Sequence, residues 1–276
     1  DYIMVVPSCR SGEVNRTESE KIMAGGKGIN VSIVLNNMGV ENTALGFISG
    51  FTGGAIENIL ADMNCKTDFI KLDNGFSRIN VKIKSDAETE INGQGPDISD
   101  GAVKKLYEKL DSLNDGDTLV LAGSIPSSLS DSIYCEIMDY LKDKKLNIVV
   151  DATKDLLVNV LKYKPFLVKP NNHEIGEIFG VELKTRSEVV PYAKKMQEKG
   201  AKTVIVTRGT KGSIAYDGTS YTEFGIIPCD VVDTMGAGDS FIAGFLYGIL
   251  QGKSLQESME QGAKNSSVTL GYSGAW

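Results

Sequence analysis

The stretch "DTMGAGDSF" (233–241) places two glycines, an alanine and an aspartate at a spacing that could do chemistry. An apolar helical pattern follows, so the amides of Gly236, Ala237 and Gly238 should lie at the positive end of a helix dipole, where they could hold an anion. Asp239 falls in the first turn beside them. It could serve only as a partner for the dipole, or it could take the proton of a hydroxyl that attacks a phosphate held on the amides.

The string Asp233-Thr234-x-Gly236-Ala237-Gly238-Asp239, followed by "SFIAGF", resembles the signature of the ribokinase family, the PfkB-type carbohydrate kinases. The resemblance implies a ribokinase-like three-layer α/β/α sandwich with a mostly parallel central sheet and a small β-lid. It also implies that Asp239 is the catalytic base. The amides of 236–238 would form the hole for the γ-phosphoryl group transferred from ATP.

A second stretch, "AGGKGIN" (24–30), matches the same family. Gly26 lets the backbone approach a ligand closely, and Asn30 can hydrogen-bond sugar hydroxyls. Lys27 suits a substrate that already carries a phosphate better than it suits a neutral sugar. The alternative is a solvated lysine on a glycine-rich turn.

Arg78 and Asn80 in "SRIN", with the loop "NGQGP" (92–96), resemble the branch that contains 1-phosphofructokinase and tagatose-6-phosphate kinase. In that branch Lys27 and Arg78 would hold the phosphate of the substrate, Arg78 through its planar fork. Members of the family have a strand of the central sheet before the aspartate that matches Asp1, and the printed sequence begins there, so we expect Asp1 to be held loosely. The positions that match sugar- or phosphate-contacting residues are Asp1, Gly26, Lys27, Asn30, Arg78 and Asn80.

The nucleotide side of the resemblance rests on "KPN" with Glu174, which gives Asn171-x-x-Glu174. This matches the family motif that organises Mg²⁺ and its waters, and one carboxylate with one amide suffices because Mg²⁺ keeps several waters. The alternative is an ordinary helix N-terminus with Glu174 in its first turn. The other positions that match nucleotide contacts are Lys169, Thr207, Gly209, Gly212 and, facing the adenine, Asn265.

Several other catalytic classes are excluded by what the sequence lacks. No Walker A, HRD or DFG string is present, which excludes P-loop and protein-kinase machinery, and no GxGxxG opens a βαβ unit. His173 is the only histidine and no GxSxG elbow occurs, which argues against a Ser-His-Asp triad.

The composition indicates an ordinary globular chain. Its 276 residues carry a formal net charge of −7 with scattered Lys and Arg, which argues against a nucleic-acid partner. No apolar run is long enough to span a bilayer, so no membrane partner is expected. The four cysteines lie far apart, and we read them as buried side chains in a reducing cytoplasm rather than as disulfides or a zinc site.

The elements that must position these residues follow from short apolar runs between amphipathic helical patterns. Such runs indicate parallel strands covered on both faces, and Ser254 with Glu257 predicts a capping box for a last helix. The predicted strands are 118–123, 147–152, 166–171 and 202–207, and the predicted helices are 131–144, 173–179, 187–199 and 238–250.

Residues 2–6 and 77–92 instead alternate apolar and polar side chains, which suits antiparallel strands with one wet face. We interpret them as a small β-lid, with an ordinary surface hairpin as the alternative. The whole chain, 1–276, is then a single ribokinase-like kinase domain with a lid formed by about 2–16 and 77–92. The resemblance makes a homodimer through the lid plausible.

The resemblance is not uniform along the chain. Residues 1 to about 201 resemble 1-phosphofructokinase, whereas about 202–276, with "VVDTMGAGDSFIAGF", resemble fructoselysine 6-kinase. This predicts a composite chain joined near residue 202, the alternative being one natural enzyme of an intermediate branch.

The expected activity is phosphorylation of fructose 1-phosphate to fructose 1,6-bisphosphate with ATP and Mg²⁺. Fructoselysine and tagatose 6-phosphate are the alternative substrates. A folded but inactive nucleotide- or sugar-binding protein is the alternative of another class.

Overall fold

Six strands from residues 118–224 form the largest sheet of the computed structural model, which describes residues 1–272. They are β7 (Thr118–Ala122), β8 (Asn147–Asp151), β9 (Leu167–Val168), β10 (Thr203–Thr207), β11 (Ser213–Tyr216) and β12 (Tyr221–Phe224). Their order is β12-β11-β10-β9-β8-β7. The strands β7 to β10 run parallel, and β11 and β12 extend the sheet antiparallel at one edge. The predicted, mostly parallel sheet is confirmed.

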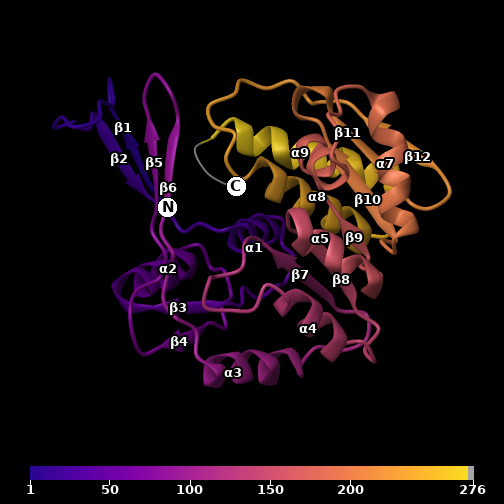
Figure 1. The fold of residues 1–276 in the computed structure, drawn as a ribbon, viewed down its shortest axis with the longest axis horizontal. Helices are drawn as coiled ribbons and strands as arrows, with labels where there is room; N and C mark the ends of the chain where they lie inside the picture. The colour runs from indigo at the N-terminus through magenta and orange to yellow at the C-terminus, as the bar shows by residue number, and fades with distance from the viewer. Residues whose placement is uncertain (273–276) are drawn as a thin grey trace.

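Helices cover both faces of this sheet because its strands are apolar on both sides. Val149 and Ile205 belong to one core, whereas Ile148 and Val150 belong to the other, as the alternation of a strand requires. The helices of the first core are α1 (Lys27–Asn37), α8 (Ala237–Leu250) and α9 (Leu255–Leu270). Those of the second are α4 (Ile133–Tyr140), α5 (Lys154–Val160), α6 (Asn172–Phe179) and α7 (Arg186–Glu198). These layers form the expected three-layer sandwich (Figure 1).

Local signals set the ends of several helices. The side chain of Ser254 accepts from the backbone N–H of Glu257, and Glu257 reaches back to the N–H of Ser254 at 2.9 Å. The predicted capping box at the start of α9 is therefore confirmed. Two short 3₁₀ helices lie between elements of this sheet and its helices: η1 (Leu161–Tyr163) and η2 (Gly209–Lys211).

The first half of the chain contributes a separate two-stranded parallel sheet that the sequence patterns did not indicate. Its strands are only three residues long, which is too short for a clear alternation of side chains. The strands are β3 (Phe47–Ser49) and β4 (Ile70–Leu72). The helices of the same part of the chain are α2 (Gly50–Asp62) and α3 (Asp100–Leu110).

A four-stranded sheet stands at one end of the body (Figure 1). Its strands are β1 (Tyr2–Val5), β2 (Ser19–Ile22), β5 (Asn80–Lys84) and β6 (Thr89–Asn92), in the order β2-β1-β5-β6. β1 runs parallel to β5, so the predicted antiparallel pairing of 2–6 with 77–92 was wrong; the antiparallel pairs are β5 with β6, inside 77–92, and β1 with β2, which was not predicted. The hairpins β1–β2 and β5–β6 leave the body in the same direction, so their first strands, β1 and β5, pair in parallel. β2 also lies beyond the predicted limit at residue 16.

Two further observations concern expectations drawn from composition. Within residues 1–272 the structure contains no helix with the length and apolarity needed to cross a bilayer. All four cysteines are free, but Cys9 is exposed in the β1–β2 turn and Cys229 is only partly buried. The prediction that all four are buried was therefore correct only for Cys65 and Cys135.

Candidate active site

The N-termini of α1 and α8 meet at the centre of the molecule. Asn30, in the first turn of α1, donates its side-chain amide to Oδ2 of Asp239, in the first turn of α8, at 2.7 Å. The N-caps are Gly26 (φ 113°) and Gly236 (φ 75°), both in backbone conformations that favour glycine. Within residues 1–272 no side chain caps either helix, so no side chain competes with an anion for these first turns, although the N–H of Ala237 donates to the carbonyl of Thr234 at 3.4 Å.

Asp239 is buried at this junction. The pKa of its carboxyl is raised to about 6, mainly by burial and also by the nearby carboxylate of Asp151, while the hydrogen bond from Asn30 and the charges of Lys27 and Lys169 act to lower it. A carboxyl with such a pKa is largely ionised at neutral pH, yet basic enough to accept a proton from a hydroxyl. The chemistry therefore fits a general base.

Asp151 is a site residue that the sequence analysis missed. It is the last residue of β8 and its side chain is 2% exposed. Its Oδ2 lies 3.0 Å from Nζ of Lys27, and its Oδ1 lies 3.6 Å from Nζ of Lys169. The string "NIVVDA" was interpreted only as a strand. Its aspartate was a usable signal, because ligands of α/β sheets bind at the carboxyl ends of the parallel strands.

Lys169 brings a buried positive charge beside the predicted anion hole. A side-chain carbon placed at Gly238 would lie 3.4 Å from Nζ of Lys169. The carbonyl of Ala237 accepts a hydrogen bond from Oγ of Ser266 at 2.6 Å, which fixes this loop to α9. The backbone amides of 236–238 and the lysine ammonium thus adjoin one another.

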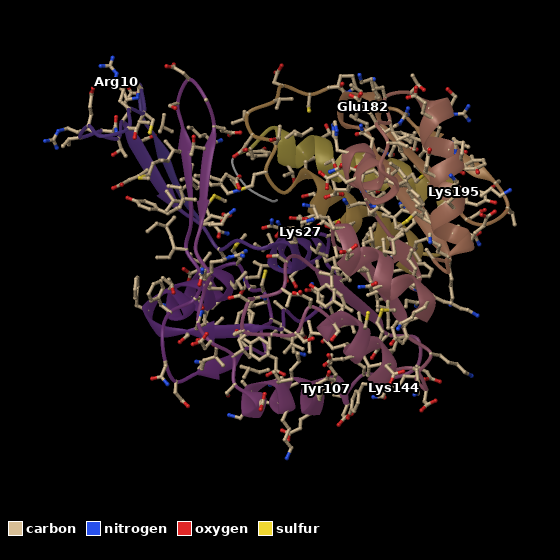
Figure 2. All side chains as sticks on the ribbon, in the orientation of Figure 1. Arg10, Lys27, Tyr107, Lys144, Glu182 and Lys195 are labelled. Atoms are coloured by element: carbon tan, nitrogen blue, oxygen red, sulfur yellow. The ribbon has the colours of Figure 1, made fainter. Side chains whose placement is uncertain are left out.

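Lys27 lies between carboxylates near the middle of the molecule (Figure 2). Burial lowers its pKa, but the attraction of Asp151 and its hydrogen bond, with Asp239 and Glu174, outweigh burial and leave the pKa raised. Its side chain is 38% exposed, so one side of the ammonium faces solvent. Lys27 is thus paired with a buried carboxylate, which the alternative of a solvated lysine on a glycine-rich turn did not include.

Asp1 is held more firmly than expected. Its Oδ1 accepts a hydrogen bond from Asn80 at 3.1 Å, and its backbone carbonyl accepts one from Met23 at 3.0 Å. A side-chain carbon at Gly25 would lie 2.4 Å from Oδ2 of Asp1, so the glycine is required for this approach. The structure thus brings Asp1 and Asn80 together.

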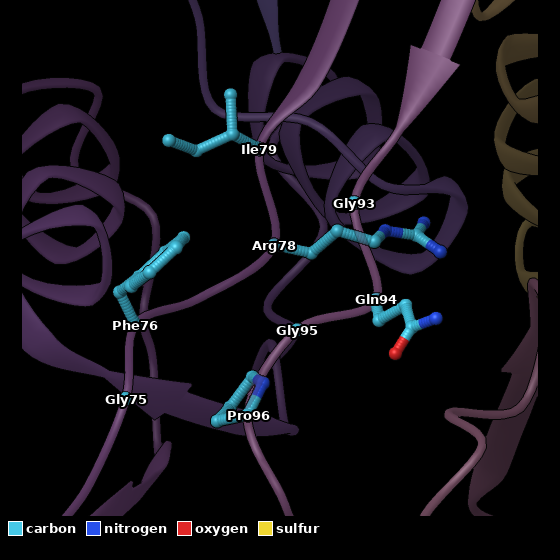
Figure 3. Close-up of a pocket in the computed structure, with 8 residues that line it drawn as sticks. All are labelled: Gly75, Phe76, Arg78, Ile79, Gly93, Gln94, Gly95 and Pro96. Atoms are coloured by element: carbon cyan, nitrogen blue, oxygen red, sulfur yellow. The ribbon is translucent and has the colours of Figure 1, made fainter.

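Arg78 lies where the chain enters β5, beside a cavity of about 350 Å³. Its guanidinium donates to Oγ of Ser124 at 3.3 Å. Figure 3 shows the side chains of Arg78 and Gln94 extending to the same side, away from Phe76 and Ile79. The guanidinium is not paired with a carboxylate in any ion pair of the described chain, which leaves its charge available to a phosphate.

Asn171 and Glu174 form a capping box at the start of α6. Oδ1 of Asn171 accepts from the N–H of Glu174 at 2.8 Å, and Oε2 of Glu174 accepts from the N–H of Asn171 at 2.7 Å. The alternative reading as a helix N-terminus therefore describes the local structure. Glu174 also acts electrostatically on Lys27, which places its charge toward the cluster.

The donor set fits a magnesium ion that keeps most of its waters. In residues 1–272 no three acidic, histidine or cysteine side chains gather closely enough to cage a metal. Mg²⁺ does not need such a cage, because one or two carboxylates with substrate phosphates hold it in many kinases. Glu174 and Asp151, whose charges both act on Lys27, would supply the negative charge for this arrangement.

The predicted nucleotide loop adjoins this capping box. Thr207 forms a parallel bridge with Asn171, and its N–H donates to the carbonyl of Pro170 at 3.1 Å. Gly209 (φ 55°) and Gly212 (φ 76°) bound η2, and a side-chain carbon at Gly212 would lie 2.2 Å from the carbonyl oxygen of Phe224. The two nucleotide motifs are thus brought together.

Asn265 is engaged within the protein. Its side-chain amide donates to Sδ of Met38 at 3.1 Å and accepts from Gln261 at 2.9 Å. A side-chain carbon at Gly244 would lie 2.8 Å from its oxygen, so Asn265 packs against α8. Its contact with adenine stays a prediction.

Comparisons with known proteins agree with this arrangement. The 1-phosphofructokinase of Bacillus subtilis is 42% identical over 98% of this chain and 88% of its own length. The D-tagatose-1-phosphate kinase of Bacillus licheniformis is 34% identical over 93% of this chain and 84% of its own length. The crystal structure of phosphofructokinase-2 from Escherichia coli with substrates and products superposes with a TM-score of 0.91, covering 98% of this chain and 89% of that one. At 23% identity, the last likeness shows the fold alone.

The similarity runs through both halves of the sequence. Because one relative matches 98% of the chain at 42% identity, the expected join near residue 202 gains no support. The family model described as "pfkB family carbohydrate kinase" matches residues 1–276. The chain therefore belongs to the pfkB family of carbohydrate kinases.

Proposed function

We propose that this kinase transfers the γ-phosphoryl group of ATP to the free terminal hydroxyl of fructose 1-phosphate and so forms fructose 1,6-bisphosphate. The observation that carries the proposal is the buried carboxylate of Asp239 between two helix ends that no side chain caps. The names of the relatives, 1-phosphofructokinase and D-tagatose-1-phosphate kinase, support a sugar 1-phosphate as acceptor.

The proposed mechanism assigns the proton to Asp239. Its carboxylate accepts the proton of the acceptor hydroxyl while the oxygen attacks the γ-phosphorus and the bond to the β-phosphate oxygen breaks. Charge on the transferred group is stabilised by the amides of 236–238 and by Lys169, whose ammonium adjoins Gly238. Asn30 holds the carboxylate in place through its 2.7 Å hydrogen bond.

The phosphate already present on the sugar would be held by Arg78 and Lys27. An ammonium has three donors, so Lys27 can keep its 3.0 Å contact with Asp151 and still donate to a phosphate. Arg78 offers a planar fork two residues before Asn80, which donates to Asp1. Glu174 and Asn171 would hold Mg²⁺ through water, and the ion when bound neutralises charge on the ATP phosphates.

The four-stranded sheet would act as the lid. A lid that closes over the sugar excludes water, which is a competing acceptor for the phosphoryl group. The glycines beside the cavity in Figure 3, Gly75 (φ 78°) and Gly95 (φ 85°), lie where the sheet joins the body and suit a hinge.

The outer face of this sheet supports a homodimer. Ile22, Tyr2, Val81 and Ile91 lie side by side in the register of the four strands and therefore point to one face. Ile22 and Ile91 are 68% and 59% exposed. An apolar row on an exposed sheet is suited to a second copy of the same sheet. The cytoplasm remains our proposal for the compartment, supported by the four free cysteines.

D-tagatose 1-phosphate is the second candidate acceptor, because a relative at 34% identity carries that name. ADP release is measured with fructose 1-phosphate, tagatose 1-phosphate, tagatose 6-phosphate, fructose 6-phosphate and fructoselysine. We expect the highest kcat/KM with fructose 1-phosphate. Tight ATP binding without ADP release from any acceptor would overturn the proposal and favour a binding protein.

A further inference from the structure

A buried ion pair joins the four-stranded sheet to the loop before α8. Nζ of Lys84, the last residue of β5, lies 2.9 Å from Oδ2 of Asp233, and the two side chains are 25% and 3% exposed. No hydrogen bond reaches this oxygen within residues 1–272. The ammonium of Lys84 therefore supplies the countercharge for a buried carboxylate, which is costly to leave unpaired.

Asp233 in turn shapes the loop that leads into the anion hole. Its Oδ1 accepts from the N–H of Met235 at 3.1 Å, and its own N–H donates to the carbonyl of Leu270 at 3.2 Å. Met235 directly precedes Gly236, whose φ of 75° starts α8. A displacement of Asp233 therefore changes the turn that orients the amides of 236–238.

The same face of β5 also carries a residue on the substrate side. Asn80 and Lys84 are four positions apart and so point to one face, with about 13 Å between them along the strand. Asn80 bonds to Asp1 at one end, and Lys84 pairs with Asp233 at the other. Lys82, between them, pairs instead with Glu90 of the neighbouring strand at 3.0 Å.

We propose that the pair between Lys84 and Asp233 is a latch through which the position of the four-stranded sheet sets the anion-holding loop. The inference rests on the proposed function, because it gives the closing of this sheet a role in phosphoryl transfer. When the sheet lies as it does in this structure, Lys84 neutralises Asp233 and the loop is held. When the sheet moves away, the carboxylate loses its countercharge and the loop relaxes, which disfavours transfer to water. Lys84 touches no reacting atom and is a positioning residue.

The test compares Lys84→Met with Lys82→Met, a matched change on the same strand face. Backbone hydrogen exchange of residues 233–238 is measured without substrates, and kcat and both KM values are measured with ATP and fructose 1-phosphate. For Lys84→Met we expect about tenfold faster exchange in this segment and about tenfold lower kcat, with the KM for ATP unchanged. Lys84→Arg should recover most of the loss, and Lys82→Met should resemble the wild type.

The latch is contradicted if Lys84→Met leaves exchange in 233–238 unchanged, or if Lys82→Met reproduces its effects. The exchange comparison decides this even if the wild type phosphorylates no sugar phosphate, a result that would overturn the proposed function alone. If Lys84→Met does not fold, Asp233→Asn is compared with the double variant Lys84→Met/Asp233→Asn, in which no buried charge is left unpaired. The latch predicts equal exchange and turnover in these two, and a further loss in the double variant contradicts it.

Discussion

The junction of α1 and α8 and the four-stranded sheet hold the functional groups of this kinase in opposite ways. At the junction Asp239 and Asp151 are buried, paired and fixed by helices packed on the central sheet. On the four-stranded sheet every residue of β2 and β6 is exposed, and the sheet joins the body through glycine-rich segments. Under the proposed function, the base Asp239 is thus fixed in the core, whereas Arg78, Asn80 and Asp1, proposed for the sugar, lie where the four-stranded sheet joins the body.

The largest expected effect comes from Asp239→Asn. We expect kcat to fall by about 10² to 10⁴ or more, with ATP binding retained, because the general base is removed. Near-wild-type turnover of Asp239→Asn would show that Asp239 is not the general base.

The same variant should be more stable than the wild type at neutral pH. The pKa of Asp239 is raised from 3.8 to about 6 in the folded protein, so ionisation of the buried group lowers the free energy of unfolding as pH rises through this range. Thermal melts should therefore show a higher Tm for Asp239→Asn above pH 7, by a few degrees, and a much smaller gain near about pH 4, where the folded protein keeps the proton. An equal gain at both pH values would mean that charge is not the cause.

Asp151→Asn should lower kcat by about 10- to 100-fold, because Lys27 and Lys169 lose the carboxylate that positions them. If Asp151 held the two lysines only for stability, Asp151→Asn would lower the Tm and leave kcat within twofold of the wild-type value. Asp155→Asn, in the first turn of α5, is the control and should leave kcat unchanged.

Some parts of the fold and of the site could be predicted from the sequence, and others could not. The loop 233–241, the parallel strands and the cap at Ser254 were predicted because each is encoded within a few consecutive residues. The ion pairs of Asp151 were not predicted, because Lys27 lies 124 positions away in the sequence and only the packing of α1 on the sheet brings the two residues together. The parallel pairing of β1 with β5 was missed for the same reason, because side-chain alternation does not encode the direction of a distant partner strand.

On the sheet side of the comparison, Arg78→Ala should raise the KM for fructose 1-phosphate by about 10- to 100-fold and change kcat and the KM for ATP little. The loss is one bidentate, charge-assisted contact to the phosphate. Arg186→Ala, at an exposed pair with Glu223, is the matched control and should leave all three constants unchanged. An unchanged KM in Arg78→Ala would remove this residue from the sugar site.

The smallest effect on turnover is expected from Ile91→Lys on the outer face of the four-stranded sheet. A lysine in this apolar row should separate the proposed dimer, because it places a charge where two copies of the sheet would meet. Light scattering should show a monomer for Ile91→Lys and a dimer for Leu250→Lys, an equally drastic change at an exposed site on α8. A wild-type monomer would contradict the dimer.

The central claim is that the acceptor proton passes to a buried Asp239 whose pKa depends on its neighbours. The most direct measurement is the pH dependence of the single-turnover rate at saturating ATP and fructose 1-phosphate, in the wild type and in Asp151→Asn. We expect the wild-type rate to fall below a pH of about 6. In Asp151→Asn the fall should move to lower pH, because Asp151 raises the pKa of Asp239, whereas Lys27 and Lys169 lower it. A wild-type rate that stays flat through this range, or a fall that Asp151→Asn does not move, would contradict the claim.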